Sequence, residues 1–171
     1  MRRAGLVLTV WLLLFCSGCE LTQKPTAPCP LPAAFSADVQ ITQGVFQAAA
    51  AMRVRETGET TFTLREPAAL QTLEIAVRED GVRFSFLGLL LETPPALLPD
   101  ASFAASLYAA FEALRSGADC AQTPYGDGTA YTCKTAAGDL FTLTADKNGA
   151  PVTLVMESRN LQADFTDFSA E

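Results

Sequence analysis

The sequence predicts an α+β fold in which one main helix is inserted between two meanders of a strongly twisted antiparallel sheet. Apolar and polar residues alternate with a period of two over most of the chain, which is typical of strands with one buried face. The pairs Asp80-Gly81 and Asn148-Gly149 are two-residue turn signals between such strands. A single stretch, near residues 100–116, carries apolar residues at helical spacing instead.

The first meander begins where Phe35, Ala37, Val39 and Ile41 alternate with polar residues. A second alternating run follows, and a turn at residues 56–59 leads into three shorter ones. Asp80-Gly81 joins the last two of these as a hairpin. We expect strands at residues 35–42, 46–54, 62–64, 73–77 and 82–86.

The helix follows a segment rich in Leu and Pro, LGLLLETPPALLP, at residues 87–99. Asp100 is a residue type that caps helix N-termini, and Gly117 is the type that ends helices. Between them the large apolar residues recur at spacings of three and four, so they form one stripe that packs on the sheet. That stripe consists of Phe103, Leu107, Phe111 and Leu114.

The last third of the chain returns to strand patterns, at residues 129–134, 140–145, 152–157 and 161–168. Gly-containing turns separate the first three of these, at residues 137–139 and 147–149. A loop at residues 125–128 precedes them. The second meander is therefore expected to have four strands.

The N-terminus has the features of a secretory signal: Arg2 and Arg3, an apolar run over residues 5–15, and small residues after it. Ser17-Gly18-Cys19 resembles the lipobox of bacterial lipoproteins, whose cysteine thiol is diacylated and becomes the new N-terminus. Residue 16, where lipoboxes usually have Leu, is Cys. An ordinary signal cut at another small residue and an uncleaved anchor are the alternatives, but the run is well short of the roughly 20 residues of a spanning helix.

The lipobox divides the chain into three expected parts. Residues 1–18 are a lipoprotein signal peptide, residues 19–33 a lipidated Pro-rich tether, and residues 34–171 a single antiparallel β domain with its helix near 100–116. Cys19 is the lipidation site. The protein is accordingly expected at the cell membrane or outer envelope, lipid-anchored and extracytoplasmic.

The remaining cysteines are Cys29, Cys120 and Cys133. In an exported protein, Cys120 and Cys133 are best explained as a local disulfide, although a metal pair or two free thiols are the alternatives. The chain has no His, and its cysteines lack CxxC spacing, so we expect neither a zinc site nor another cofactor. Cys29 is expected to be a free thiol in the tether.

Composition narrows the classes of function. The formal net charge of −7 becomes more negative when Arg2 and Arg3 leave with the signal, which excludes nucleic acid as an electrostatic partner. Without His there is no Ser-His-Asp or Cys-His apparatus, and no nucleotide-binding or hydrolase motif is present. The carboxylate pairs Glu79-Asp80 and Glu56/Glu59 fall in expected turns. We therefore expect no enzyme.

The order of elements resembles the half-open β-barrel of the periplasmic lipoprotein-carrier family. The resemblance is carried by the strand pair over residues 35–56, by TFTLREPAALQTLEIAVREDGVRFSFLGLLLE and by the ending NLQADFTDF. It implies binding of a lipid or another apolar ligand, such as a lipoprotein's acyl chains, without catalysis. The Pro-rich start departs from the helix that often opens such carriers, and the lipid anchor favours a tethered binder over a free shuttle.

On this resemblance, the 87–99 segment would be an apolar flap at the mouth of a cavity. The alternative is that Leu89 to Leu91 form an edge strand and that Leu97 and Leu98 belong to an ordinary core. A filled core would favour a different function, an envelope scaffolding or protein-interaction module. The candidate ligand-binding residues are Met52, Phe84, Phe86, Leu89, Leu91, Leu97 and Leu98. For the strand residues Met52, Phe84 and Phe86, ordinary core is again the alternative.

The lipobox assignment predicts which cysteine carries acyl chains. Cys19→Ser removes the acylated thiol, so incorporation of labelled palmitate in cells is expected to be lost. Cys16→Ser, the matched control, should keep it. Incorporation into the Cys19→Ser protein would contradict the assignment.

Overall fold

The computed structural model describes residues 26–27 and 29–171. The predicted signal peptide, Cys19 and most of the predicted tether therefore lie outside the described residues. Within the described part of the chain, no helix is long and apolar enough to cross a membrane.

The first meander runs outward from the centre of the sheet to one edge. Each strand pairs antiparallel with the next, and the Asp80-Gly81 hairpin forms as predicted, with the Arg78 N–H donating to the Gly81 carbonyl. A short 3-10 helix, η1 (Ala68–Leu70), separates the third and fourth strands. The strands are β2 (Phe35–Gln43), β3 (Phe46–Val54), β4 (Thr60–Glu66), β5 (Glu74–Val77), β6 (Val82–Phe86) and β7 (Leu89–Thr93).

The second meander starts at the opposite edge and returns to the centre. It contains one strand more than the sequence predicted, because residues 120–125, for which no element was predicted before the loop at 125–128, pair with the next strand. The 3-10 helix η3 (Glu157–Arg159) precedes its last strand. The strands are β8 (Cys120–Tyr125), β9 (Gly128–Lys134), β10 (Leu140–Ala145), β11 (Pro151–Met156) and β12 (Leu161–Ala170).

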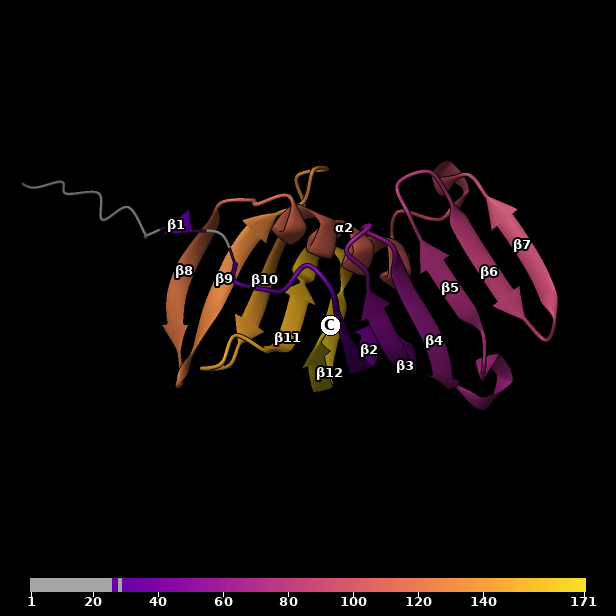
Figure 1. Ribbon diagram of the computed structural model, residues 1–171, viewed down its shortest axis with the longest axis horizontal. Helices are drawn as coiled ribbons and strands as arrows, with labels where there is room; N and C mark the ends of the chain where they lie inside the picture. Colours follow the sequence, from indigo (N-terminus) through magenta and orange to yellow (C-terminus); the bar gives the residue numbers. More distant parts are fainter. Residues whose placement is uncertain (1–25, 28) are drawn as a thin grey trace, which may run out of the picture.

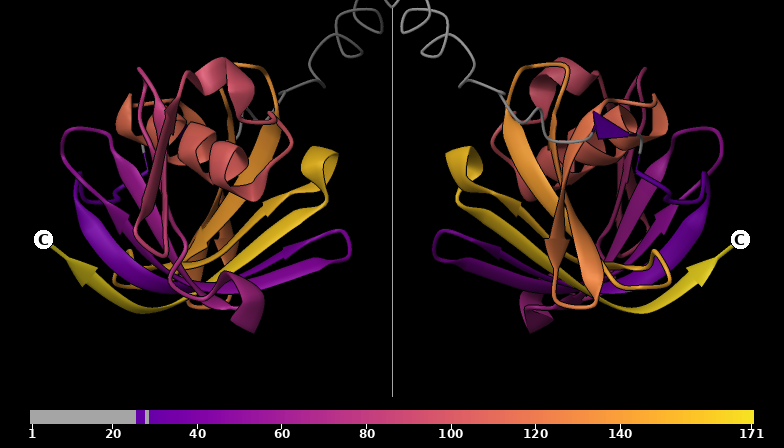
Figure 2. Two further views of the ribbon diagram at one scale, coloured as in Figure 1. Left: turned by 90° about the vertical axis from the view of Figure 1, so that its right-hand side faces the viewer. Right: turned by 90° about the vertical axis from the view of Figure 1, so that its left-hand side faces the viewer.

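Pairing of β12 with β2 joins the two meanders into one antiparallel sheet with the order β1-β8-β9-β10-β11-β12-β2-β3-β4-β5-β6-β7. The sheet curves strongly, and the helix α2 (Phe103–Arg115) lies in its concavity (Figures 1 and 2). In the described chain, β1 and β7 do not pair with each other, so the barrel stays half-open. The predicted fold class is confirmed.

The position of α2 follows from the strand order. The chain leaves β7 at one edge and must reach β8 near the other, so the connection crosses the concave face. A 13-residue helix spans about 20 Å of that distance at 1.5 Å per residue. The 3-10 helix η2 (Pro95–Leu97) and the loop after it cover part of the rest.

The helix begins two residues later than predicted. Ser102, not Asp100, is the N-cap, since its hydroxyl accepts the Ala105 N–H at 3.2 Å. Asp100 lies in the turn before it, where the Ser102 N–H donates to the Pro99 carbonyl. The predicted end is confirmed: Gly117 has a φ of +77°, and the Ala118 N–H bonds back to the Ala113 carbonyl.

The folded part also begins earlier than the predicted boundary at residue 34. β1 (Thr26–Ala27) pairs with β8, and the Cys29 side chain is buried. The prediction that Thr26, Ala27 and Cys29 belong to an unpacked tether is therefore wrong, because Pro-rich sequence can still lie along a sheet edge. Among the described residues Cys29 forms no disulfide, and burial raises the pKa of its thiol to about 11, so it is unreactive.

The predicted disulfide between Cys120 and Cys133 is present, and it ties β8 to β9 across a sequence separation of 13 residues. Cys120 also pairs with Ala27, so this bond secures the strand that holds β1. The sheet, the helix, the disulfide and the hydrophobic core all lie within residues 26–171. A chain that starts at Glu20 therefore keeps every described element and serves as the soluble form.

In that soluble form, replacing Cys120 and Cys133 with Ala is expected to lower the free energy of unfolding. The expected loss is about 3 kcal/mol, the stabilisation from closing a short loop of this size. Denaturant unfolding followed by circular dichroism measures the difference. The unsubstituted chain under reductant is the control and should show a similar loss. An unchanged unfolding midpoint in both would contradict a stabilising bond.

Candidate ligand-binding site

The middle of the concave face is filled by α2. Phe111 packs edge-on against Phe35 and Phe165, with ring centroids 5.4 and 6.0 Å apart, and Phe103 does the same against Phe62 at 5.5 Å. Leu107 and Ala110 are fully buried between these contacts. The centre of the sheet is therefore ordinary core.

Met52 belongs to that core. Its side chain is 1% exposed, and it pairs with Phe62 on the next strand, which α2 covers. The prediction that Met52 contacts ligand is therefore wrong for this structure, because the helix occupies the space that a ligand would need. Whether a strand residue on an apolar face belongs to the core depends on which element packs over it.

Beside the filled centre, a cavity of about 360 Å³ lies between α2, the ends of β5 and β6, and the segment after β7. This volume is within the range of small-molecule sites. Its apolar wall comes from both sheet and helix, with Val77 and Val82 facing Ala105 and Tyr108. The full lining is Val77, Arg78, Glu79, Val82, Pro95, Leu98, Asp100, Ala105, Tyr108 and Glu112.

From Val82 at this cavity, an apolar row continues along the inner face of β6 and β7. Phe84 pairs with Ile75 on one side and Leu91 on the other, and Phe86 pairs with Leu89. Because directly opposed residues share a face, all of them lie on the concave side. Val82 is buried, Phe84 and Phe86 are half-buried, and Leu91 and Leu89 are exposed. The half-open barrel thus leaves an apolar face open at one end.

The 87–99 segment combines both predicted alternatives. Leu89 to Leu91 form the edge strand β7, as the alternative to the flap expects. Leu98 is buried and lines the cavity, whereas Leu97 points to solvent and is 72% exposed. Of the predicted ligand-binding residues, Leu98 lines the cavity, Phe84, Phe86, Leu89 and Leu91 lie on the open row, and Leu97 touches neither.

The mouth of the cavity is acidic. Arg78 is already engaged, with its Nε 3.9 Å from Glu59 and 3.6 Å from Asp80, and Glu112 is held by Arg115 at 2.7 Å. Glu79 and Asp100 take part in no ion pair within the described residues. Two unpaired carboxylates therefore face the entrance.

The same acidic side chains also shift the pKa of Tyr108. Burial raises the pKa of its phenol, and the nearby charges of Glu112 and Glu79 raise it further, while Arg115 acts in the opposite direction. The neutral phenol is favoured in the folded protein and offers a hydroxyl that can donate a hydrogen bond to a ligand.

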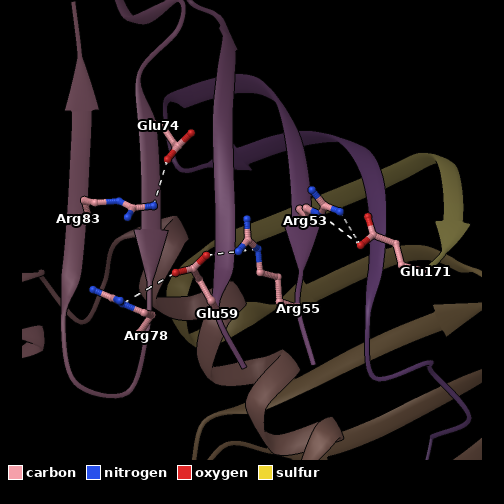
Figure 3. Close-up of polar contacts among 7 residues, drawn as sticks. All are labelled: Arg53, Arg55, Glu59, Glu74, Arg78, Arg83 and Glu171. Carbon is pink, nitrogen blue, oxygen red and sulfur yellow. Dashed lines mark hydrogen bonds and ion pairs between the residues drawn. The ribbon is translucent and has the colours of Figure 1, made fainter. Parts of the chain in front are cut away.

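The convex face of the same strands has the opposite character. Glu74 and Arg83 form an ion pair at 3.5 Å, Arg53 binds Glu171 at 2.8 Å, and Glu59 also contacts Arg55 (Figure 3). These pairs leave the outside of the sheet polar and solvated. On these strands the apolar row described above therefore lies on the concave side, away from the ion pairs.

The carboxylate pairs noted in the sequence lie in turns, as predicted, and in the described chain one member of each pair forms ion pairs with arginine. Glu59 is nearly buried and bridges Arg55 and Arg78, and Asp80 contacts Arg78. No group of three or more potential metal ligands forms among the described residues.

The helix residues that line the cavity were not predicted from the sequence. Ala105, Tyr108 and Glu112 are spaced by three and four, so they form a second stripe beside the large apolar one. The three residues of this stripe are small, amphipathic and acidic, so a search for large apolar residues does not detect it. It was the available signal for this site.

Comparison with known proteins gives distant structural likenesses. No family model and no curated protein matches the sequence. An uncharacterized conserved protein from Thermus thermophilus is 13% identical, with a TM-score of 0.49 over 82% of this chain and 80% of that one. A LolA superfamily protein from Nitrosomonas europaea is 7% identical, with a TM-score of 0.39 over 87% of each chain. The fold assignment itself rests on the strand pairing described above.

The electrostatics of the cavity predict a change in the titration of Tyr108. Glu112→Gln removes the nearest negative charge and frees Arg115, so the pKa of Tyr108 is expected to fall. Ring-labelled tyrosine NMR across alkaline pH measures it, with Tyr108→Phe assigning the signal. An unchanged or higher pKa of Tyr108 would contradict the effect ascribed to Glu112.

The same shift has a consequence for stability. A phenol whose pKa is raised on folding contributes stability that is complete below the unfolded pKa of about 10 and is lost as pH rises through the folded value. Tyr108→Phe should therefore flatten the alkaline loss of stability.

Proposed function

We propose that the protein is a membrane-anchored extracytoplasmic lipoprotein that binds a lipid or another apolar ligand, without catalysis, at the β5–β7 end of its concave face. The observation that carries this proposal is the continuous apolar row from the cavity at Val82 to exposed Leu89. The anchor, the cleavage before Cys19 and the extracytoplasmic location rest on the N-terminal sequence. Membership of the lipoprotein-carrier family belongs to the same proposal.

The row and the cavity have complementary uses. A cavity of this size takes only part of a long chain, whereas the row beyond Phe84 gives the remainder an apolar surface to lie on. Burying exposed leucines and ligand carbon together removes apolar area from water, which is the main source of affinity at such a site.

The charge at the entrance favours some head groups over others. Glu79 and Asp100 repel a carboxylate or a phosphate. The Tyr108 hydroxyl can donate a hydrogen bond to a neutral head group, and the carboxylates accept hydrogen bonds from an amine-bearing one. The proposed ligand is therefore an apolar chain with a neutral or cationic head.

A second candidate function is an envelope scaffolding or protein-interaction module. The filled centre of the concave face favours it, since α2 packs over the aromatic residues there and leaves that part of the sheet closed to a ligand. The experiment below distinguishes the two candidates.

Filling the cavity is expected to weaken ligand binding selectively. Ala105 lines the cavity, so Ala105→Leu places a larger side chain in it, and displacement of an apolar dye by a dodecyl amphiphile should weaken about tenfold or more. Ala109→Leu is the matched control, because Ala109 is also half-buried on α2 but does not line the cavity. Equal displacement by both variants, or none by the parent chain, would favour the interaction module.

Native mass spectrometry of the soluble form, purified without detergent, gives an independent test. A co-purified lipid that is lost on organic extraction supports the ligand-binding proposal. A clean apo mass combined with no dye displacement counts against it.

A further inference from the structure

β7 is an edge strand without the usual protection against pairing. Within the described chain it pairs with β6 alone, so one side of its backbone faces no other strand. Natural edge strands are blocked by Lys, Pro, bulges or covering elements. Leu89–Thr93 has the sequence LLLET, in which Glu92 is the one charged residue and Lys and Pro are absent, and its three leucines are 61–76% exposed.

The leucines lie on both faces of the strand, so ligand binding on the concave side covers only some of them. Leu89 and Leu91 oppose Phe86 and Phe84 on the concave face, whereas Leu90 opposes Ser85 on the convex face. An apolar ligand in the proposed site leaves Leu90 and the free backbone edge in water. Pairing with another strand covers both.

We propose that the free edge of β7 pairs antiparallel with β7 of a second copy, making a two-fold symmetric dimer with one continuous sheet. The residues that flank β7 limit how far this pairing can extend. Gly88, with a φ of +81°, belongs to the β6–β7 turn, and Pro94 has no N–H to donate. The pairing therefore uses Leu89 to Thr93.

Symmetry then fixes the register. In a continuous sheet the opposed residues point to the same face, so paired positions must both be odd or both be even. Using all five residues places Leu91 opposite Leu91 of the partner. Leu89 then faces Thr93, and Leu90 faces Glu92.

This register is self-complementary in chemistry. The concave side of the junction carries leucines and threonines alone, and they extend the apolar row of each copy into that of the other. On the convex side Glu92 faces Leu90 rather than a second Glu92, and each Glu92 is opposed within its own chain by Arg83.

A second copy of the same chain provides an edge strand that matches β7 in length. The opposite edge of the sheet consists of the two-residue strand β1 and, beyond it, residues 122–125 of β8, where Pro124 has no N–H to donate. A five-residue strand cannot form a full ladder there, so head-to-tail growth is disfavoured and a closed pair results. The contact is small, so the dimer is expected to be weak.

Register-specific crosslinking tests the proposal in the soluble form with Cys29→Ala. Opposed Cα atoms of paired strands lie within disulfide range, so Leu91→Cys alone is expected to give an oxidised dimer. Leu89→Cys alone should not, but should crosslink when mixed with Thr93→Cys. Leu90→Cys should crosslink only with Glu92→Cys.

Sedimentation of the unsubstituted soluble form gives the second readout. Its weight-average mass should rise toward twofold with concentration, and Leu90→Glu should keep it at one chain because it places a second carboxylate directly opposite Glu92 of the other copy. Circular dichroism checks that each variant is folded. Crosslinking that ignores register, or a single-chain mass at every concentration, would overturn the proposal, whatever the outcome of the ligand assays.

Discussion

The pairing of β2 with β12 is the constraint that organises the whole molecule. It joins residues 35–43 to residues 161–170, nearly the full length of the described chain apart, and converts two separate meanders into one sheet. Its inward residues, among them Phe35, Val39 and Phe165, form the floor of the concavity. Because the outer ends of both meanders then lie at opposite edges, their connection has to cross that floor.

The position of this connection determines which part of the concave face is covered and which part stays exposed. α2 lies against β5 and β9 and fills the middle with Leu107 and Phe111, while β6 and β7 extend beyond it. A sheet of this width has more apolar inner surface than one 13-residue helix can cover. The cavity at Val82 and the row toward Leu89 are the uncovered remainder, and its ligand-binding role is our proposal.

Charge is distributed in accordance with that division. On the convex face, Arg53, Arg83 and Arg55 each have a carboxylate partner, which keeps the outer surface polar without a strong net field (Figure 3). At the mouth of the cavity, Glu79 and Asp100 lack such partners in the described chain. The two ends of the exposed apolar surface therefore differ, with an acidic entrance at one end and a bare strand edge, Leu89–Thr93, at the other.

The strand and helix pattern could be predicted from the sequence, because alternation, Asp-Gly and Asn-Gly turns and a helical stripe are local signals. The Cys120–Cys133 pairing could be predicted as well, since the two cysteines are close in a sequence that begins with a predicted export signal. That Met52 is core and Leu98 lines a cavity emerged only from the folded chain, because both are apolar residues whose burial depends on what packs over them. The same holds for the Ser102 cap and the burial of Cys29, since competing caps and edge packing are settled by contacts between distant segments.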